Sequence, residues 1–453
     1  MKRYLLFALL SVPFLATWSQ ETPQTPQTPQ TPQTSTPTWS LERCITHAVA
    51  NNLQIRQQEK TVESQQIALN TAQSSRLPSL QASLSQSFSF GRGLTIDNTY
   101  TNRNTMNSGG DLGASLPIYT GGQITHNIRS NKLELSAALA DLERARQDLS
   151  VQVASAYLEV LFQQSLLDIA RQQVELSQAQ VRRMELLFEN GKTAETNVAE
   201  ARATNASDQL QLTQADNSYQ LALLTLSQLL ELPTPEGFCI EVPDIPLPQD
   251  ILLEAPEEIY LQAVGQKPVV EASRLRVEEA KEGIATARSG HLPQLSLNAG
   301  LSTNYYKVMD MPAPTFSDQL RDNFSKYVGI NLSIPIFDRN STRNRVRTAR
   351  VQYEGRQLAL EQVQKDLFKE IQQAYYNAVA AQSQCISSEA AEAAAQTAFD
   401  LVTSKYENGK ATATEYQESK LRLQRAQADR AQARYTFLFR QKILDFYRGV
   451  AIK

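Results

Sequence analysis

Apolar side chains occupy every second position in four short stretches of the chain, with mostly small or polar residues between them. Successive side chains of a β-strand point to opposite faces, so this alternation predicts strands with one apolar and one polar face. We expect strands at about 78–90, 111–118, 293–302 and 327–337. Their apolar positions are Leu80, Ala82, Leu84, Phe88 and Phe90; Leu112, Ala114, Leu116 and Ile118; Leu295, Leu297, Ala299 and Leu301; and Val328, Ile330, Leu332, Ile334 and Ile336.

A different repeat, of seven residues, fills the long stretches that follow the second and fourth expected strands. Sustained seven-residue spacing of apolar and small residues indicates helices packed as coiled coils. One helix is expected from about 123 to 189 and would be about 100 Å long at a rise of about 1.5 Å per residue. One seam is Ile128, Leu135, Leu142, Leu149, Ala156, Gln163, Ala170, Ser177 and Met184; its counterparts 218 positions later are Val346, Tyr353, Leu360, Leu367, Ala374, Ala381, Ser388, Ala395 and Val402.

The chain is internally duplicated. The segments LPIYTGGQ, AYLEVLFQQ and ENGK of the first half correspond to IPIFDRNS, AYYNAVAAQ and ENGK of the second half at the same offset of 218. Two tandem repeats, 39–231 and 257–453, are therefore expected, joined by a proline-rich connector at 232–256. Each repeat is predicted to run helix, strand, loop, strand, long helix, turn and helix, with the first helix at 41–77.

The tetrapeptide ENGK lies where each seven-residue seam stops. Asn-Gly supplies residues that tolerate positive φ, so each long helix is expected to turn back there as an antiparallel helical hairpin. The two expected tips are Glu189, Asn190, Gly191 and Lys192, and Glu407, Asn408, Gly409 and Lys410.

The N-terminus has the pattern of an export signal. Lys2 and Arg3 precede an apolar run that ends in small residues, which predicts a signal peptide over 1–19. A threonine-, proline- and glutamine-rich spacer follows over 20–38. No later stretch has the roughly 20 apolar residues of a membrane-spanning helix.

Composition gives no sign of catalysis, and no cofactor or metal is expected. The formal charge of -3 gives no indication of a nucleic-acid partner. His47, His126 and His291 have no acidic or cysteine partners at ligand spacing, so surface or packing roles are expected. Three scattered cysteines argue against a disulfide framework, and buried or partly buried thiols are expected at Cys44, Cys239 and Cys385.

Four strands with two different faces cannot close a barrel, since closure takes about eight. Open sheet edges are not tolerated in lipid, so the chain is expected to share a barrel with other copies, three copies giving twelve strands around a watery lumen. The fold class is mainly α with membrane β. The positions expected to face lipid are Leu80, Leu84, Phe88, Leu112, Leu116, Leu295, Leu297, Val328, Ile330 and Leu332.

These paired strand starts (LPSL and LPQL), strand exits and hairpin tips, in this order and in two copies, resemble the TolC family of outer-membrane exit ducts of Gram-negative bacteria. The resemblance covers about 41–448. It implies a homotrimer, a twelve-stranded barrel in outer-membrane lipid and a helical tunnel across the periplasm. It also implies two partners, a periplasmic adaptor (membrane fusion) protein and an inner-membrane transporter of RND or ABC type.

The resemblance also assigns roles to individual residues. Glu415 and Glu418 fall where the family narrows the periplasmic mouth with acidic residues, and Asn197 is the equivalent position in the first repeat, where the family often has an acid. The hairpin tips would contact the adaptor. Structural alternatives remain open. In these, Glu415 and Glu418 are ordinary solvated charges, and the tips are turns without a binding role.

A basic cluster follows the fourth strand and can be interpreted in three ways. Its arginines lie at the periplasmic headgroups, line the upper tunnel, or form a solvated face, which is favoured; they are Arg339, Arg343, Arg345, Arg347 and Arg350. Two rival functions also remain. An exported trimeric coiled-coil stalk or adhesin would explain the heptads but not the paired strands, and a periplasmic adaptor would have only one hairpin.

Overall fold

The computed structural model describes residues 38–94, 98–234, 238–242, 254–309, 311–450 and 452. The expected signal peptide and all of the expected spacer except Thr38 lie outside the described residues. Within the described residues, no helix is long and apolar enough to cross a membrane.

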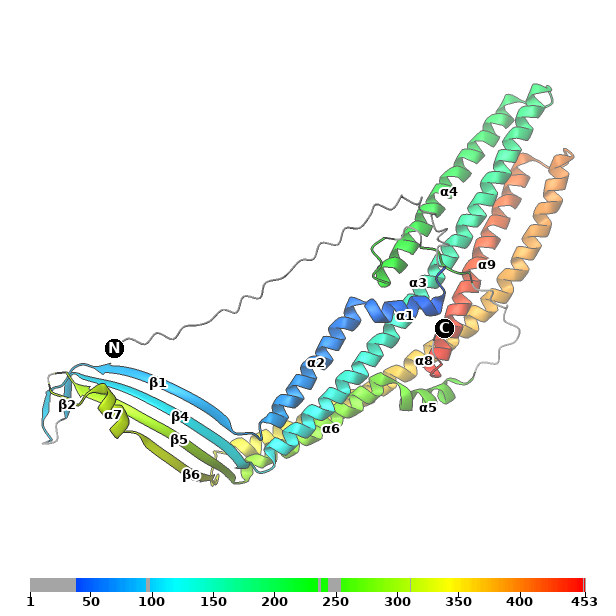
Figure 1. The fold of residues 1–453 in the computed structure, drawn as a ribbon. Coiled ribbons are helices and arrows are strands. Elements are labelled where there is room, and N and C mark those ends of the chain that lie inside the picture. The colour runs from blue at the N-terminus through cyan, green and yellow to red at the C-terminus, as the bar shows by residue number, and fades with distance from the viewer. Residues whose placement is uncertain are drawn as a thin grey trace, which may run out of the picture. The chain divides into compact units, whose positions relative to one another are not determined.

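The first repeat consists of long helices, two strands of a four-stranded sheet and a short two-stranded ribbon (Figure 1). Its elements in chain order are α1 (Leu41–Asn51), α2 (Leu53–Ser74), β1 (Ser79–Ser89), β2 (Arg92–Leu94), β3 (Tyr100–Asn102), β4 (Thr105–Tyr119), α3 (Gln123–Glu189) and α4 (Glu195–Leu229). Strands β2 and β3 form a separate two-stranded ribbon that the alternation pattern did not predict.

The second repeat follows the same order. Its elements are α5 (Pro256–Gln266), α6 (Pro268–Arg288), the 3₁₀ turn η1 (Ser289–His291), β5 (Gln294–Val308), α7 (Phe316–Asp322), β6 (Ser325–Ser333), α8 (Ser341–Glu407) and α9 (Ala413–Tyr447). Helix α7 lies in a segment that was expected to be loop.

The helix expected at 41–77 is in fact two helices. It breaks at Asn52, whose extended backbone ends α1 while its side-chain oxygen accepts a hydrogen bond from the Gln54 N–H and caps α2. The second repeat also breaks, at Lys267 directly before Pro268, with an extended backbone but without a side-chain cap. A residue before proline is disfavoured in helical conformation, which accounts for the second break.

The long helix predicted from 123 to 189 is confirmed as α3, and α8 is its counterpart of equal length. Helices α3, α4, α8 and α9 lie side by side (Figure 1), and α3 also packs against α2 and α6. Most of the predicted seam is buried within the protomer, including Leu142, Leu149, Leu367 and Ala374. Burial of this apolar stripe stabilises helices of this length more than helix propensity does.

The antiparallel sheet has the order β1-β4-β5-β6, so its central pair joins the two repeats. Strand β4 begins at Thr105 and β5 continues to Val308, both beyond the expected bounds. Strand β6 ends at Ser333, so the expectation that Ile334 and Ile336 belong to it is wrong. Pro335 between them has no N–H to donate to a ladder.

The two largest apolar clusters among the described residues anchor the helices. In the first, Tyr157 of α3 is fully buried near α1, and its hydroxyl donates to the Glu241 carbonyl at 2.5 Å. In the second, Ile371 of α8 packs with Ile259 of α5 and Val270 of α6. The described part of the connector also contributes, because Ile240 pairs with Trp39 in a parallel bridge.

Candidate membrane face and helical hairpin tips

The sheet register places every expected lipid-facing residue on one face. Leu112 lies opposite Ala82 of β1 on one side and Leu301 of β5 on the other, and Leu297 lies opposite both Leu116 and Ile330. Residues directly opposite in an antiparallel pair point to the same face. This face is open to solvent in the single chain: Leu84 is 91% exposed.

Polar and small residues form the other face of the sheet. Ser115 donates to Asn298 Oδ1 at 2.9 Å, and the Ser302 and Ser325 hydroxyls lie 2.7 Å apart. The Tyr327 ring lies across Gly300, where an added Cβ would sit 2.5 Å from Cε1 of that ring. Cross-strand polar pairs therefore bind adjacent strands on the face that the alternation pattern assigned to water.

Both ENGK segments form the same C-terminal cap. Gly191 and Gly409 have φ of 68° and 70°. The Lys192 N–H donates to the Leu187 carbonyl at 2.8 Å, and the Lys410 N–H makes the corresponding 2.8 Å bond to Lys405. These are the bonds of a Schellman motif, so the predicted turn is confirmed.

The asparagine of each tip has a different role from the one expected. Asn190 and Asn408 have φ of -87° and -90°, so the glycine alone takes the left-handed conformation. Each asparagine instead donates its side-chain amide to a carbonyl four residues earlier, at 2.6 Å and 2.7 Å. The same carbonyl also accepts from the asparagine's own backbone N–H at 3.3 Å, so the side chain adds a second, shorter hydrogen bond at the helix end.

Glu415 takes part in the start of α9. Its carboxylate accepts from the Thr412 N–H at 2.7 Å while the Thr412 hydroxyl accepts from the Glu415 N–H at 3.2 Å, which is a capping box. The backbone hydrogen bond from Thr412, with help from its hydroxyl, lowers the pKa of Glu415. Sequence reasoning missed this role, although T-x-x-E before a helix is its signal.

The other two expected mouth residues are exposed. Glu418 lies one turn after Glu415 on α9, and Asn197 donates its amide to the Thr193 hydroxyl at 2.8 Å at the start of α4. The single chain brings Glu415 and Glu418 onto neighbouring positions of one helix and leaves Asn197 on another hairpin.

The two hairpins are tied together near their tips. Arg183 of α3 binds the Glu407 carboxylate at 3.0 Å and the Glu407 carbonyl at 3.1 Å, and Gln180 donates to the Tyr406 hydroxyl at 2.9 Å. The Tyr406 ring stacks on Tyr416 with centroids 4.9 Å apart. Nothing in the local sequence signals these contacts, because the partners lie on separate hairpins.

A buried ion pair lies further along the same hairpins. Lys420 of α9 and Asp208 of α4 approach to 2.5 Å, and their side chains are only 4% and 9% exposed. Gln424 and Gln211 continue this polar seam with a 3.0 Å hydrogen bond. A charge buried this deeply is strongly destabilising if its partner is removed.

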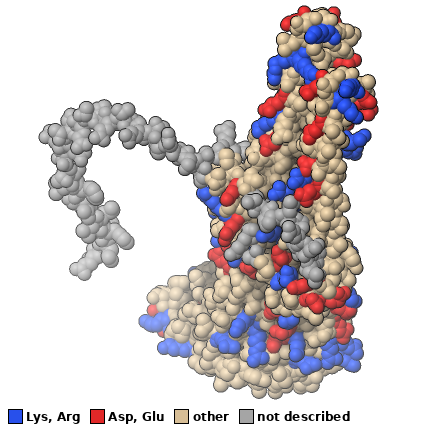
Figure 2. All heavy atoms as spheres, turned by 90° about the vertical axis from the view of Figure 1, so that its right-hand side faces the viewer, with Lys and Arg blue, Asp and Glu red and all other residues tan. Residues whose placement is uncertain are grey.

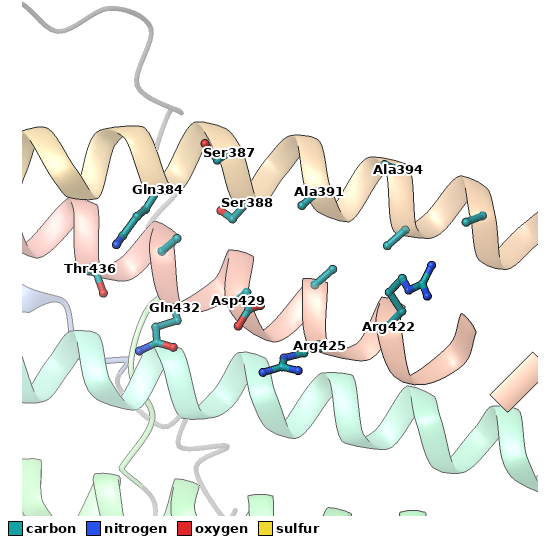
Figure 3. A pocket seen from close by; sticks show the side chains of 14 residues that line it. Gln384, Ser387, Ser388, Ala391, Ala394, Arg422, Arg425, Asp429, Gln432 and Thr436 are labelled. Atoms are coloured by element: carbon teal, nitrogen blue, oxygen red, sulfur yellow. The ribbon is translucent and has the colours of Figure 1, made fainter. Parts of the chain in front are cut away.

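Helices α8 and α9 enclose a groove of about 910 Å³ (Figure 3). Small side chains of α8, including Ser388, Ala391 and Ala394, line one wall, and Arg422, Arg425 and Asp429 of α9 line the other. One wall therefore offers small side chains, against which a further helix can pack closely, and the other offers charged ones.

The histidines and cysteines take packing or surface positions. His126 Nδ1 lies 2.6 Å from Glu282 Oε2, and His47 packs edge-on against Trp39. Cys44 and Cys385 are buried free thiols, and burial raises the pKa of Cys44 to about 12. The expectation of burial is wrong for Cys239, which is exposed. The described residues contain no cluster of three potential metal ligands.

A sheet with one continuous apolar face, joined to long paired helical hairpins, defines the class of outer-membrane channel proteins. The chain belongs to the outer membrane efflux protein family, whose model matches residues 44–231 and 259–449. It is an outer-membrane channel protein of the efflux and secretion type.

Individual relatives agree with this assignment. The chain is 26% identical over 389 residues to outer membrane protein TolC of Escherichia coli (strain K12), covering 82% of this chain and 74% of TolC. It is 22% identical to outer membrane efflux protein BepC of Brucella suis biovar 1 (strain 1330), covering 82% and 77%. The fold matches the outer membrane protein VceC of Vibrio cholerae with a TM-score of 0.73 at 19% identity, covering 91% of this chain and 97% of VceC.

Proposed function

We propose that three copies of the chain form a passive duct across the outer membrane and the periplasm. Each copy supplies the four strands β1, β4, β5 and β6 to a twelve-stranded barrel, with the apolar face toward lipid and the serine-rich face toward a watery lumen. Helices α3, α4, α8 and α9 continue the lumen as a periplasmic tunnel.

One observation carries this proposal: the sheet has a continuous apolar face and two edge strands, β1 and β6, with no partner among the described residues. Lipid tolerates no unpaired strand edge, so the sheet must close with other copies. The groove between α8 and α9 supports the same assembly, because a helix of a neighbouring copy would fill it.

The duct works with two partners in this proposal. A periplasmic adaptor contacts the tips at Gly191, Lys192, Gly409 and Lys410, and an inner-membrane transporter of RND or ABC type delivers the exported compound. Rings of Glu415 and Glu418, with Asn197 opposite, narrow the mouth and favour cations. The Arg183–Glu407 and Gln180–Tyr406 contacts hold the second hairpin in its present position.

The barrel is tested by extracting the protein from membranes in detergent and comparing its electrophoretic migration with and without heating. A shared barrel gives a slow band that collapses to the protomer on heating, together with ion conductance in planar bilayers. Replacing Val328 and Ile330 on the apolar face by aspartate should abolish the slow band. The matched control replaces Asn331 and Ser333 on the polar face by aspartate and should retain it. A soluble, non-conducting rod would favour the stalk or adhesin instead.

The mouth is tested by conductance. The double variant Arg183→Ala/Tyr406→Phe removes both polar ties near the tips, so single-channel conductance should rise. Glu418→Gln should lower cation selectivity without changing the open size. Unchanged conductance in the double variant and unchanged selectivity in Glu418→Gln would contradict this location of the mouth.

A further inference from the structure

Six of the basic side chains that lie within about three helical turns of the sheet belong to α3, to α8 or to the turn before α8. They are exposed, and no carboxylate among the described residues comes within 4.0 Å of their side-chain nitrogens. Figure 2 shows Lys and Arg atoms in a band across the lower part of the visible face. We call these six residues the basic belt: Arg129 and Lys132 on α3, Arg339 in the turn before α8, and Arg343, Arg347 and Arg350 on α8.

The belt recurs in both repeats at matching positions. Arg129 and Lys132 correspond to Arg347 and Arg350 at the offset of 218. On α8, Arg343, Arg347 and Arg350 have the spacing i, i+4 and i+7 of a single helical face. Further from the sheet, the same face carries the exposed acids Glu354 and Glu361. Lys365 on this face pairs with Glu361, so the basic residues of this face that lack an acidic partner lie at the end of the helix next to the sheet.

The turn before α8 carries backbone strain that the first repeat avoids. Gly121 and Gly122 have φ of 64° and 84°, and glycine adopts such angles freely. In the second repeat Arg339 and Asn340 hold φ of 55° and 64° at the corresponding positions. The second repeat has an arginine in the left-handed conformation at a position where the first repeat has glycine. This strain indicates a functional role for the arginine side chain.

The handedness of the chain shows which way the α8 face points. The Met309 N–H donates to the Asn104 carbonyl at 2.8 Å, which continues the β4–β5 ladder. In this register the backbone groups of the even-numbered residues of β4, such as Leu112, form the hydrogen bonds to β5. For L-residues, this places β5 to the left of β4 when the apolar face is viewed with the helices below. The helices follow the same order, α2, α3, α6 and α8.

In that view α8 descends with α6 on its right, and its buried stripe of Thr342, Val346 and Ala349 is directed toward α6. Residues of a right-handed helix advance by about 100° each, so Arg343, Arg347 and Arg350 lie about 80 to 140° round from Thr342. That rotation turns them toward the viewer, on the same side as the apolar face of the sheet. The α8 residues of the belt therefore lie directly below the apolar face that is proposed to contact lipid.

We propose that the basic belt binds the phosphates of anionic phospholipids in the periplasmic leaflet of the outer membrane. Guanidinium groups match phosphate oxygens with two parallel hydrogen bonds, and basic clusters next to a membrane span favour anionic headgroups. Ile336 and Phe337 support this placement, because they lie between β6 and the belt and are 95% and 79% exposed. The proposal rests on the outer-membrane location of the chain.

The test counts lipids on the full-length protein in mild detergent by native mass spectrometry. Phosphatidylglycerol is the probe, and phosphatidylcholine and inorganic phosphate are compared at equal concentration. The wild type should retain phosphatidylglycerol preferentially and lose it as salt is raised. The double variant Arg343→Gln/Arg347→Gln should bind phosphatidylglycerol roughly 30-fold more weakly. Each basic residue near an anionic surface raises the affinity about fivefold, and the variant removes two of them.

The matched control is Arg345→Gln/Arg356→Gln, which removes the same charge from another face of the same helix and should keep wild-type binding. Equal loss in both double variants, no preference for phosphatidylglycerol, or equal competition by inorganic phosphate would overturn the proposal. Conductance of both variants in planar bilayers separates failure of the lipid site from failure of the channel.

Discussion

The two repeats share their backbone and differ in the side chains at corresponding positions. The helices α3 and α8 have 67 residues each, and α4 and α9 have 35 each. Both long helices end in the same Schellman motif. Duplication therefore preserved the seven-residue seam and the glycine turns, which set helix length and direction.

Four places show how the side chains diverged. The helix break has a neutral Asn52 in the first repeat and a cationic Lys267 in the second, yet both donate to the end of a returning helix, to Leu229 and Phe446. The other differences are Gly121 against Arg339 before the long helix, Ala194 against Thr412 before the returning helix, and Arg202 against Lys420 within it. At these four places the second repeat therefore carries three cationic residues, Lys267, Arg339 and Lys420, where the first carries one, Arg202.

The largest difference is expected between the corresponding cations Lys420 and Arg202. Lys420→Met leaves Asp208 buried without a partner and should cost about 3–5 kcal/mol. Arg202→Met removes an ion pair with Glu185 whose side chains are 65% and 36% exposed, and should cost less than about 1 kcal/mol. Thermal unfolding followed by circular dichroism measures both. The double variant Asp208→Leu/Lys420→Met should recover most of the loss, and equal costs for the two single variants would remove the distinction.

The turns before the long helices should respond in opposite directions. Gly121→Ala places a Cβ 2.7 Å from Leu292 Cβ on a residue with positive φ, so it should destabilise the protein by about 2 kcal/mol or more. Arg339→Gly relieves the strain and should stabilise it by up to about 1 kcal/mol. The same thermal measurement applies. A neutral Gly121→Ala would show that the turn relaxes.

The helix breaks should differ in their response to alkaline pH. Burial lowers the pKa of Lys267 to about 8 in the folded protein, against 10.5 ordinarily. Between these values the unfolded chain binds more protons, so stability should rise with pH, by about 2 °C in Tm per pH unit. Lys267→Met should abolish this rise, whereas Asn52→Ala should leave it intact. A rise that persists in Lys267→Met must come from another group.

The starts of the returning helices should show the smallest difference. Thr412→Ala removes the capping box of α9 and should cost about 1 kcal/mol, while Ala194→Thr offers α4 a cap that it lacks. The folded pKa of Glu415 is lowered, so its contribution is present above about pH 4.5 and is lost as pH falls through the folded value. Amide hydrogen exchange should therefore show the start of α9 fraying in acid. Protection of α4 should stay constant, and equal fraying of both would contradict the assignment.

The sequence by itself determined the parts of this protein that depend on periodicity and local turns. Alternation placed Leu80, Leu112 and Val328 on apolar strand faces, the heptad fixed α3, and ENGK fixed the hairpin tips. These features depend on residues a few positions apart, so the pattern contains the whole cause. The strand ends beyond Leu301 and before Asp111 were not predicted, because apolar and polar residues do not alternate there.

Only the tertiary structure decided which elements meet. The β4–β5 pairing sets Leu112 beside Leu301 and merges both repeats into one face. The contacts of Arg183 with Glu407 and of Lys420 with Asp208 join residues more than 200 positions apart. Such contacts depend on the rotation and axial shift of one helix against another. Differences of a fraction of a turn change the partner while leaving each helix's own periodicity unaltered.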